Sequence, residues 1–149
     1  MSSIFTGALS VGILSWFWAY ISAKLGFITW VGFIGCTSYF ASGGEFKGLK
    51  KSLICNMSGV LWAMMIIKGS NIFNFAQAGA ILTGIFSFVM CYQSRNKYLT
   101  FIPGAFMGAC STFGANADYK SVIISLFLGA LVGYFSDLGG KLLYKHFGK

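Results

Sequence analysis

Charged residues are scarce in this chain, and so are the residue types that most catalytic and metal sites require. Lys and Arg number 11, Asp and Glu only 3, and there is one histidine and one proline in 149 residues. Charged residues make up 9% of the chain and hydrophobic residues 56%, whereas a soluble domain carries about 25% charged residues. The composition therefore lacks the polar surface needed to face water and predicts a membrane protein.

Several classes of site have no sequence signature here. There is no HExxH, GxSxG or CxxC pattern, no pair of carboxylates within an apolar stretch, and no Cys/His couple. We expect no catalytic residue, no cofactor and no metal site, so the chain is not expected to be an enzyme. The four cysteines lie in apolar stretches and are expected to be small packing residues: Cys36, Cys55, Cys91 and Cys110.

The net charge of +8 comes from basic residues that stand between apolar runs. This pattern is typical of loops that set membrane topology, so nucleic acid is not an expected partner and the lipid bilayer is. A cytoplasmic N-terminus places eight basic residues inside (Lys47, Lys50, Lys51, Arg95, Lys97, Lys141, Lys145, Lys149) and three outside (Lys24, Lys68, Lys120). The positive-inside rule therefore predicts a multi-pass protein with both termini in the cytoplasm.

Six apolar stretches are long enough to be membrane-spanning candidates, since a crossing helix needs roughly 20 residues and about 17 can suffice. Backbone amides in lipid must be paired within their own segment, and the alternation of a β-barrel strand is not seen. The prediction is an all-α membrane protein, residues 1–149, forming a single integral membrane domain. The six predicted helices are about 4–22, 27–43, 52–68, 72–93, 98–116 and 121–139.

The chain repeats itself. "FIGCTSYF" at 33–40 and "FMGACSTF" at 106–113 share four letters at the same places, 73 positions apart. "GALSVGILSW" at 7–16 matches "GAILTGIFSF" at 79–88, and "GVLW" at 59–62 matches "GALV" at 129–132, at spacings of 72 and 70. Membrane segments draw on few residue types, but three matches in the same order favour a true duplication.

The duplication predicts two three-helix repeats, repeat A at about 4–70 and repeat B at about 72–143. Three crossings are an odd number, so the second repeat must enter the membrane from the opposite side, and the two repeats are inverted. Inverted repeats meet around a pseudo-two-fold axis in the membrane plane and suit proteins through which solutes cross. Duplication can also serve stability alone.

The middle helix of each repeat is the predicted solute path. Segments 27–43 and 98–116 are short, mix glycines with hydroxyls, and include Pro103, which we expect to bend or break its helix near the start. The predicted path residues are Phe33, Cys36, Thr37, Ser38, Phe40, Pro103, Phe106, Cys110, Ser111 and Phe113.

Two faces of these helices compete as the lining. One is the stripe Phe33, Cys36, Thr37 and Phe40 with Phe106, Ala109, Cys110 and Phe113; the other carries Gly35, Ser38, Gly108 and Ser111. Either could line a path. All of these residues could instead serve helix packing, because small residues let membrane helices approach closely.

Polar residues elsewhere favour passive conduction. Glu45, Asp118 and Asp137 lie at or near predicted helix ends, and Asp137 is expected to pair with Lys141. Driven transport usually leaves a titratable group inside the membrane, so a path for a small neutral or weakly polar solute is the simpler hypothesis. The expected interhelical hydrogen-bond partners are Asn56, Asn74 and Gln77.

Two other functions remain open. One is an ion-coupled transporter of small solutes, with an ion held by backbone carbonyls near Pro103 or Gly43. The other is a non-conducting scaffold for a cytoplasmic partner, docked on Lys47, Lys50, Lys51, Arg95 and Lys97. In each case a homo-oligomer is expected, because a chain of this size has little interior shielded from lipid.

Three long motifs resemble one protein family. "GILSWFWAYISAKLGFITWVGFIGCTSYFASGGEFKGLK", "GVLWAMMIIKGS" and "FIPGAFMGACSTFGANADYK" are similar to the bacterial inner-membrane family typified by YcdZ, a domain family of unknown function. The resemblance covers about residues 7–135. It implies a small multi-helix protein of the bacterial inner membrane and carries no binding or catalytic residue across.

Overall fold

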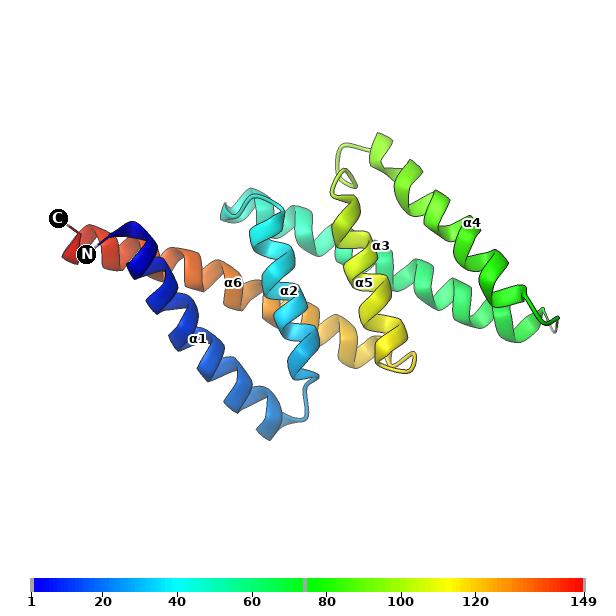
Figure 1. Ribbon diagram of the computed structural model, residues 1–149, viewed down its shortest axis with the longest axis horizontal. Coiled ribbons are helices and arrows are strands. Elements are labelled where there is room, and N and C mark those ends of the chain that lie inside the picture. The colour runs from blue at the N-terminus through cyan, green and yellow to red at the C-terminus, as the bar shows by residue number, and fades with distance from the viewer. Residues whose placement is uncertain (1, 74, 149) are drawn as a thin grey trace.

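The computed structural model describes residues 2–73 and 75–148. Within them the chain forms six α-helices and one turn of 3-10 helix, with no β-strand (Figure 1). The all-α prediction is confirmed. The α-helices are α1 (Ser3–Leu25), α2 (Thr29–Ala41), α3 (Glu45–Ile72), α4 (Ala78–Tyr92), α5 (Ile102–Gly114) and α6 (Tyr119–Phe147), and the 3-10 turn η1 (Gln93–Arg95) follows α4.

The helix ends follow local sequence chemistry. Ser2 caps α1 by accepting a hydrogen bond from the Phe5 amide at 3.3 Å, and Gly26 ends that helix with a φ of 75°, a left-handed conformation that glycine adopts at no steric cost. Asp118 caps α6. Hydrogen bonds from the Ser121 hydroxyl and amide hold the pKa of the Asp118 carboxyl below its ordinary value.

Pro103 does not bend or break a helix, contrary to the sequence expectation. It is the second residue of α5, which begins at Ile102. At this position the amide that proline lacks would have had no partner inside the helix, so proline fits without cost. Pro103 therefore helps to set where α5 starts, and α5 is shorter than the predicted segment.

The helices differ in length, and the difference bears on how they cross a bilayer. Only α1, α3 and α6, with 23, 28 and 29 residues, are long and apolar enough to be candidate spans among the described residues. The helices α2 and α5 have 13 residues each, which is about 20 Å at 1.5 Å per residue against a hydrocarbon core of about 30 Å. Six helices were expected and six are present, but three of them fall below the length of an ordinary span.

The two short helices lie side by side at the centre of the molecule and run in opposite directions (Figure 1). Each packs mainly on a long helix of the other half of the chain: α2 on α6, and α5 on α3. The outer helices follow the same rule, because α1 packs mainly on α6 and α4 packs mainly on α3. The two long helices also contact each other beneath the short ones.

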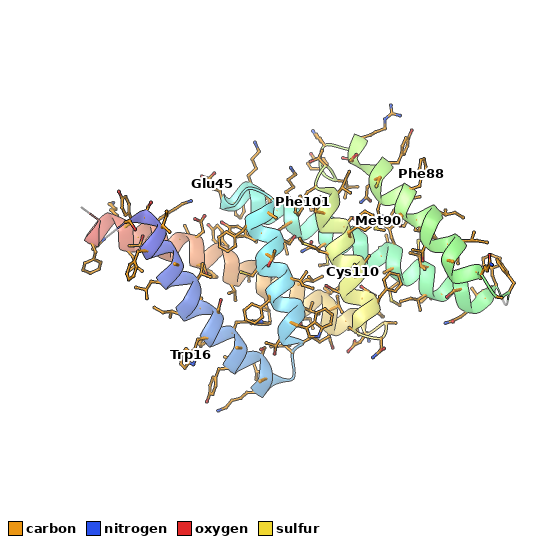
Figure 2. The ribbon with its side chains drawn as sticks, in the orientation of Figure 1. Trp16, Glu45, Phe88, Met90, Phe101 and Cys110 are labelled. Carbon is orange, nitrogen blue, oxygen red and sulfur yellow. The ribbon has the colours of Figure 1, made fainter. Side chains whose placement is uncertain are left out.

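The ends of the helices fall along two opposite edges. The two termini, the α2–α3 turn and the α4–α5 segment lie along the upper left edge in Figure 1, and the other three turns lie along the lower right edge. Successive helices therefore run alternately from one edge to the other. Large exposed apolar side chains cover the outer helices; Trp16 on α1 and Phe88 on α4 point away from the bundle (Figure 2).

Candidate functional site

The helix α2 has one buried face and one exposed face. Gly35, Ser38 and Tyr39 are buried against the long helices, whereas Phe33 and Thr37 are exposed. The exposed face also carries Phe40 near the C-terminal end of α2, with 42% of its surface accessible. The serine face of α2 is therefore a packing face.

The helix α5 is divided in the same way. Gly108, Ser111 and Thr112 are buried, whereas Cys110 and Phe113 are exposed. Two of the predicted path residues, Ser38 and Ser111, thus lie in the protein core, and the stripe with the aromatic rings is the more exposed of the two, although its member Ala109 is buried. Cys36, on the same predicted stripe as Phe33, is also buried, with 8% of its surface accessible.

Glycines explain why the short helices pack so closely on the long ones. A Cβ added to Gly35 would collide with the Leu126 carbonyl oxygen of α6, and one added to Gly108 would collide with the Asn56 carbonyl oxygen of α3. The contacts are backbone to backbone, which is the geometry that small residues permit in membrane bundles.

A second pair of glycines, on the long helices, makes the reciprocal contacts. A Cβ on Gly59 of α3 would collide with the Ala105 carbonyl oxygen of α5, and one on Gly129 of α6 would collide with the Gly32 carbonyl oxygen of α2. Gly59 and Gly129 are 70 positions apart, and Gly32 and Ala105 are 73 positions apart. The glycines of the octapeptide pair and of the 59–62 and 129–132 pair are therefore used for helix packing, whereas Gly12 and Gly84 of the remaining pair have open space around them.

The hydrogen bonds of the repeated serines in this core differ. Ser38 Oγ lies 2.8 Å from the Asn56 side-chain amide. When the Asn56 nitrogen is directed toward its acceptors, it reaches Ser38 and also the Gly104 carbonyl oxygen at 3.0 Å, joining α3 to both short helices. Ser111 instead donates to the Met107 carbonyl oxygen of its own helix at 2.7 Å.

The prediction of a hydrogen bond between helices is not met by Gln77, and it does not apply to the described residues at position 74. Gln77 precedes α4 and makes no side-chain capping bond, and Asn74 lies outside the described residues. The expectation that all four cysteines serve packing is half right, because Cys36 and Cys55 are buried and Cys91 and Cys110 are exposed.

Between the open faces of α2 and α5 lies a depression of about 320 Å³. Four predicted path residues line it: Thr37, Pro103, Phe106 and Cys110. Ile34 and Met107 complete the lining, and these two are themselves 73 positions apart, as are Thr37 and Cys110. The depression therefore lies where the two short helices present equivalent residues to each other, and no charged side chain lines it. Cys110 is labelled on α5 in Figure 2.

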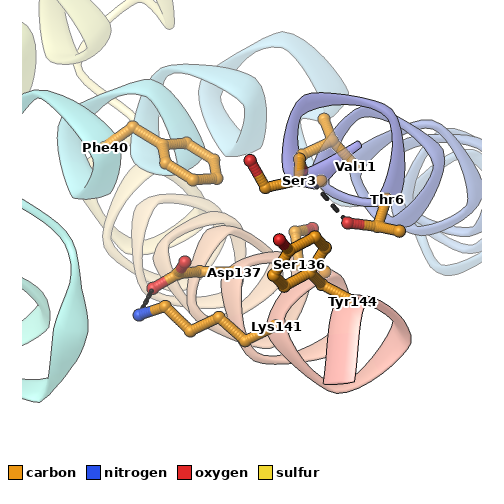
Figure 3. Close-up of a pocket in the computed structure, with 10 residues that line it drawn as sticks. Ser3, Thr6, Val11, Phe40, Ser136, Asp137, Lys141 and Tyr144 are labelled. Carbon is orange, nitrogen blue, oxygen red and sulfur yellow. Dashed lines mark hydrogen bonds and ion pairs between the residues drawn. The ribbon is translucent and has the colours of Figure 1, made fainter. Parts of the chain in front are cut away.

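Phe33, Phe40 and Phe113 do not line this depression. Phe40 lines a separate cavity of about 270 Å³ among α1, α2 and α6, which also includes Ser3, Thr6, Asp137 and Lys141 (Figure 3).

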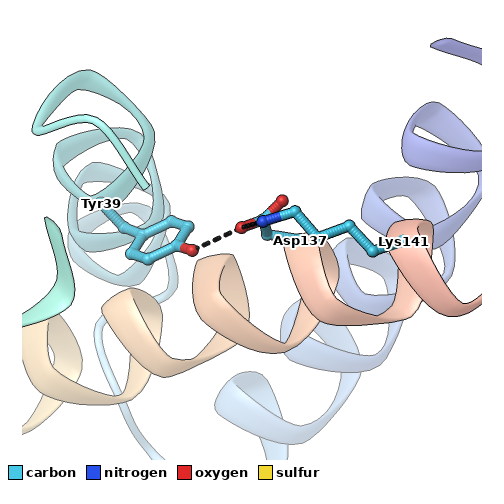
Figure 4. A network of polar contacts seen from close by, with 3 residues as sticks. All are labelled: Tyr39, Asp137 and Lys141. Carbon is cyan, nitrogen blue, oxygen red and sulfur yellow. Dashed lines mark hydrogen bonds and ion pairs between the residues drawn. The ribbon is translucent and has the colours of Figure 1, made fainter. Parts of the chain in front are cut away.

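Asp137, one of the residues that line this cavity, makes two polar contacts. It accepts hydrogen bonds from the Tyr39 hydroxyl at 2.9 Å and from Lys141 Nζ at 3.0 Å (Figure 4). The expected Asp137–Lys141 ion pair is confirmed. Tyr39 was not anticipated, because its partner is 98 positions away in the sequence and only the packing of α2 on α6 brings the two together.

Comparison with known proteins gives a consistent family. The family described as "Protein of unknown function (DUF1097)" matches residues 8–141. The chain is similar to "Inner membrane protein YcdZ" of Escherichia coli strain K12, with 44% identity over 136 residues that cover 90% of this chain and 83% of the relative. The Salmonella typhimurium protein of the same name is 43% identical, with coverage of 90% and 85%.

A more distant relative is "Uncharacterized protein YahC" of Escherichia coli strain K12, with 29% identity and coverage of 96% of this chain and 94% of the relative. No solved structure matches. These relatives bear out the resemblance to a YcdZ-like family. The names of the two YcdZ proteins state a location and no activity.

Proposed function

On the premise that this chain belongs to the DUF1097 family of proteins of unknown function, we propose that it gives passive passage to a small neutral or weakly polar solute along the open face of α2 and α5. Its relatives are named inner membrane proteins, and its long helices are apolar enough to cross a bilayer. It is a membrane protein, and those names support a location in the bacterial inner membrane. Conduction, its route and its solute are the proposal.

The first support is the arrangement expected of inverted repeats. Helices α2 and α5 run in opposite directions at the centre of the molecule, and the glycine contacts recur at spacings of 70 and 73 positions. A pseudo-two-fold axis in the membrane plane relates such halves and brings equivalent surfaces together near the midplane. We propose that residues 4–70 and 72–143 are these two repeats.

The second support concerns orientation. The termini, the α2–α3 turn and the α4–α5 segment share one edge, and eight of the eleven basic residues belong to these regions. Under the positive-inside rule this edge faces the cytoplasm. The proposed topology therefore has six crossings. The two 13-residue helices, α2 and α5, give the shortest helical path across the membrane.

The observation that carries the path is the depression between α2 and α5. It lies between the two 13-residue helices, where the barrier is about 20 Å by helix length. Its polar groups are the Thr37 hydroxyl and the Cys110 thiol, which suit a neutral solute better than an ion because neither carries the charge or the ring of oxygens that ions require.

The depression is open on one side, so we propose that a second copy of the chain closes it. Phe33, Phe40 and Phe113 stand exposed on the same two helices and would supply the apolar walls between subunits. This places the path between subunits in a homo-oligomer. Light scattering of the detergent-solubilised protein tests this part of the proposal, and a strictly monomeric protein would contradict it.

Thiol accessibility tests the path itself. Cys110 lines the depression and is free. In a chain where Cys36, Cys55 and Cys91 are replaced by Ala, we expect a charged, membrane-impermeant methanethiosulfonate reagent to label Cys110 in intact membranes. The same reagent should reduce solute flux in liposomes, measured with urea, glycerol, short carboxylic acids and ions.

The matched control places one cysteine at a lipid-facing site. Ile85 lies at the middle of α4 with 52% of its surface exposed, so Ile85→Cys in a background without other cysteines should stay unlabelled. Labelling only of Cys110 supports the path. If Cys110 resists the reagent, or if no solute in the panel crosses, the proposal is overturned.

The same flux panel separates the two alternatives. An ion-coupled transporter would move its solute only with a sodium or proton gradient. A scaffold would move nothing, and substitution of Lys47, Lys50, Lys51, Arg95 and Lys97 would abolish capture of its partner. Because Asp137, the deepest of the three acids in the sequence, is held by two hydrogen bonds, passive conduction remains the proposal we favour.

A further inference from the structure

Four lysines converge on one pocket at the edge of the molecule that carries the α2–α3 turn. Three of them, Lys47, Lys50 and Lys51, lie on the first two turns of α3, and Lys97 comes from the segment between η1 and α5. The pocket has a volume of about 440 Å³. Its other lining residues are Ile54, Tyr98 and Thr100.

The three α3 lysines share a helix face with an apolar residue. Positions 47, 50, 51 and 54 follow the i, i+3, i+4, i+7 rule, so Lys47, Lys50, Lys51 and Ile54 form one stripe that runs from the helix start toward the middle of the protein. Ile54 is 41% exposed. The pocket is therefore cationic at the edge of the molecule and apolar where it continues along α3.

The loop that supplies the fourth lysine is fixed against α3. Cys55 Sγ lies 3.7 Å from the Tyr98 carbonyl oxygen, and the Tyr98 amide donates to Asn96 Oδ1 at 3.0 Å. Lys97 lies over the Tyr98 ring and Lys50 over the Phe46 ring, with 5.0 and 4.6 Å from the ammonium nitrogen to the ring centroid. These contacts fix the segment that carries Lys97 against α3 and place two of the four ammonium groups over aromatic rings.

No carboxylate offsets these charges. The one salt bridge among residues 2–73 and 75–148 joins Lys141 to Asp137, and none of the residues lining the lysine pocket is acidic. Gathering four like charges is unfavourable unless an anion is bound. Glu45, at the start of α3 (Figure 2), is the acidic residue nearest to these lysines in the sequence, and it does not line the pocket.

The fold itself does not need the lysines. At the equivalent positions, 70 residues later, the chain has Ala117 in the turn before α6, and Lys120, Ser121 and Ile124 in the first turns of α6. The apolar residue and one lysine are kept, and two of the three α3 lysines are replaced by small residues. The positive-inside rule requires only that basic residues lie somewhere in these loops. It does not explain why four lysines line one pocket.

We propose that this pocket binds the headgroup of an anionic phospholipid. The ammonium groups would neutralise the lipid phosphate, and the acyl chain would lie along the exposed apolar face of α3 below Ile54. Basic pockets between helices at the membrane surface suit such headgroups. The site lies on α3 and the α4–α5 segment, so the binding is independent of conduction along α2 and α5.

The test measures lipid binding to the purified full-length chain. Nanodiscs or mixed micelles would contain phosphatidylcholine with increasing cardiolipin or phosphatidylglycerol, and bound lipid would be counted by native mass spectrometry. We expect both anionic lipids to be retained and phosphatidylcholine to be released. The double variant Lys50→Gln/Lys51→Gln should bind them roughly 30-fold more weakly, from about a fivefold loss per lysine.

The control removes two positive charges outside the pocket. Arg95→Gln/Lys145→Gln changes the net charge equally and touches no residue of the pocket, so its affinity for anionic lipid should change by less than about twofold. Circular dichroism and the thermal midpoint in lipid-free micelles show whether each variant is folded. If the pocket variant does not fold, Lys97→Gln alone, expected to lose several-fold, takes its place.

Three results would overturn the proposal. Equal weakening in the two double variants would mean a diffuse charge effect with no site. Binding of inorganic phosphate or glycerol phosphate as tightly as of the lipids would point to a soluble anion, and binding of a polyglutamate peptide with no lipid retention would point to an acidic protein partner.

Discussion

Two contacts at the centre of the molecule have the same backbone and different side-chain chemistry. Where α2 crosses α6, Gly35 meets the carbonyl oxygen of Leu126; where α5 crosses α3, Gly108 meets the carbonyl oxygen of Asn56. Leu126 and Asn56 stand at positions related by the spacing of 70. At the first contact the side chain is the apolar one of Leu126. At the second it is the buried amide of Asn56, which bonds to both short helices from α3.

The difference separates the residues that determine helix packing from those that differ between the two halves. Glycine is present wherever backbone meets backbone, because any Cβ would collide there. The hydrogen bonds around these contacts are not repeated: Tyr39 bonds to Asp137, whereas Thr112, at the equivalent position of α5, donates to its own helix at Gly108. The two halves share their glycine packing and differ in their hydrogen bonds.

The strongest way to break this comparison is to add one methyl group at the shared contacts. Gly59→Ala and Gly129→Ala each place a Cβ against a backbone carbonyl of a short helix. Because a backbone cannot move aside cheaply, we expect each to lower the free energy of unfolding by about 2 kcal/mol or more. Unfolding of the purified protein by SDS in mixed micelles measures this.

The controls for these variants are Gly12→Ala and Gly84→Ala, at positions 72 apart where an added Cβ has open space within 4 Å. Alanine should be neutral or stabilise the helix by about 0.5–1 kcal/mol at these sites. If all four substitutions had the same effect, close backbone approach would not be what holds the short helices in place.

Removal of one serine hydroxyl from each half sharpens the comparison. Ser38→Ala deprives the buried Asn56 amide of a partner and should cost about 1 kcal/mol, whereas Ser111→Ala removes only a bond within α5 and should cost less than about 0.5 kcal/mol. The same SDS titration measures both. An equal cost would mean that the Ser38–Asn56 contact contributes no stability.

The contact between Tyr39 and Asp137 should have a smaller effect. Tyr39→Phe keeps the ring and removes the hydroxyl, and Asp137 retains its bond to Lys141. We expect a loss of about 0.6 kcal/mol, the usual value for one hydrogen bond between helices in a membrane. Thr112→Val at the equivalent position is the control, because Thr112 bonds only within its own helix. A larger loss for Thr112→Val than for Tyr39→Phe would mean that the Tyr39–Asp137 bond between helices is not the more stabilising of the two.

The smallest effects on stability are expected at the exposed rings. Phe40 and Phe113 are related by the spacing of 73 and have 42% and 40% of their surface exposed. Phe40→Ala and Phe113→Ala should each lower the free energy of unfolding by less than about 0.5 kcal/mol, since lipid tails are as apolar as the protein interior and can replace the contacts of a half-exposed ring. Under the proposed function they should admit larger solutes in the liposome assay. Unchanged size selectivity in both would argue against a path on this face.

Local chemistry allowed much of the fold to be anticipated. Few charges and long apolar runs pointed to membrane helices, and each of the six predicted segments overlaps one helix of the structure. The boundaries were less accurate because a helix is not confined to its apolar residues: α3 extends back through Lys47, Lys50 and Lys51. Pro103 marks a helix start, a role that depends on where the preceding chain turns.

The candidate site was only partly predictable. The repeated octapeptides located the two helices that meet at the centre, but their sequence left two faces open as the lining. The structure buries the face of Ser38 and Ser111 and leaves Thr37 and Cys110 beside a depression. The lysine pocket was visible in the sequence only as basic loops, because its members come from segments about 50 positions apart.

By itself the sequence determined that this is a membrane protein, that its helices fall at these places, and that its central motif is written twice. Only the tertiary structure decided that each short helix packs on the long helix of the opposite half, and which of its faces is covered. The reason is physical: lipid and protein interior are equally apolar, so hydrophobicity does not tell a lipid-facing side from a buried one. That choice depends on backbones that approach each other at glycines far apart in the chain, a property of pairs of helices.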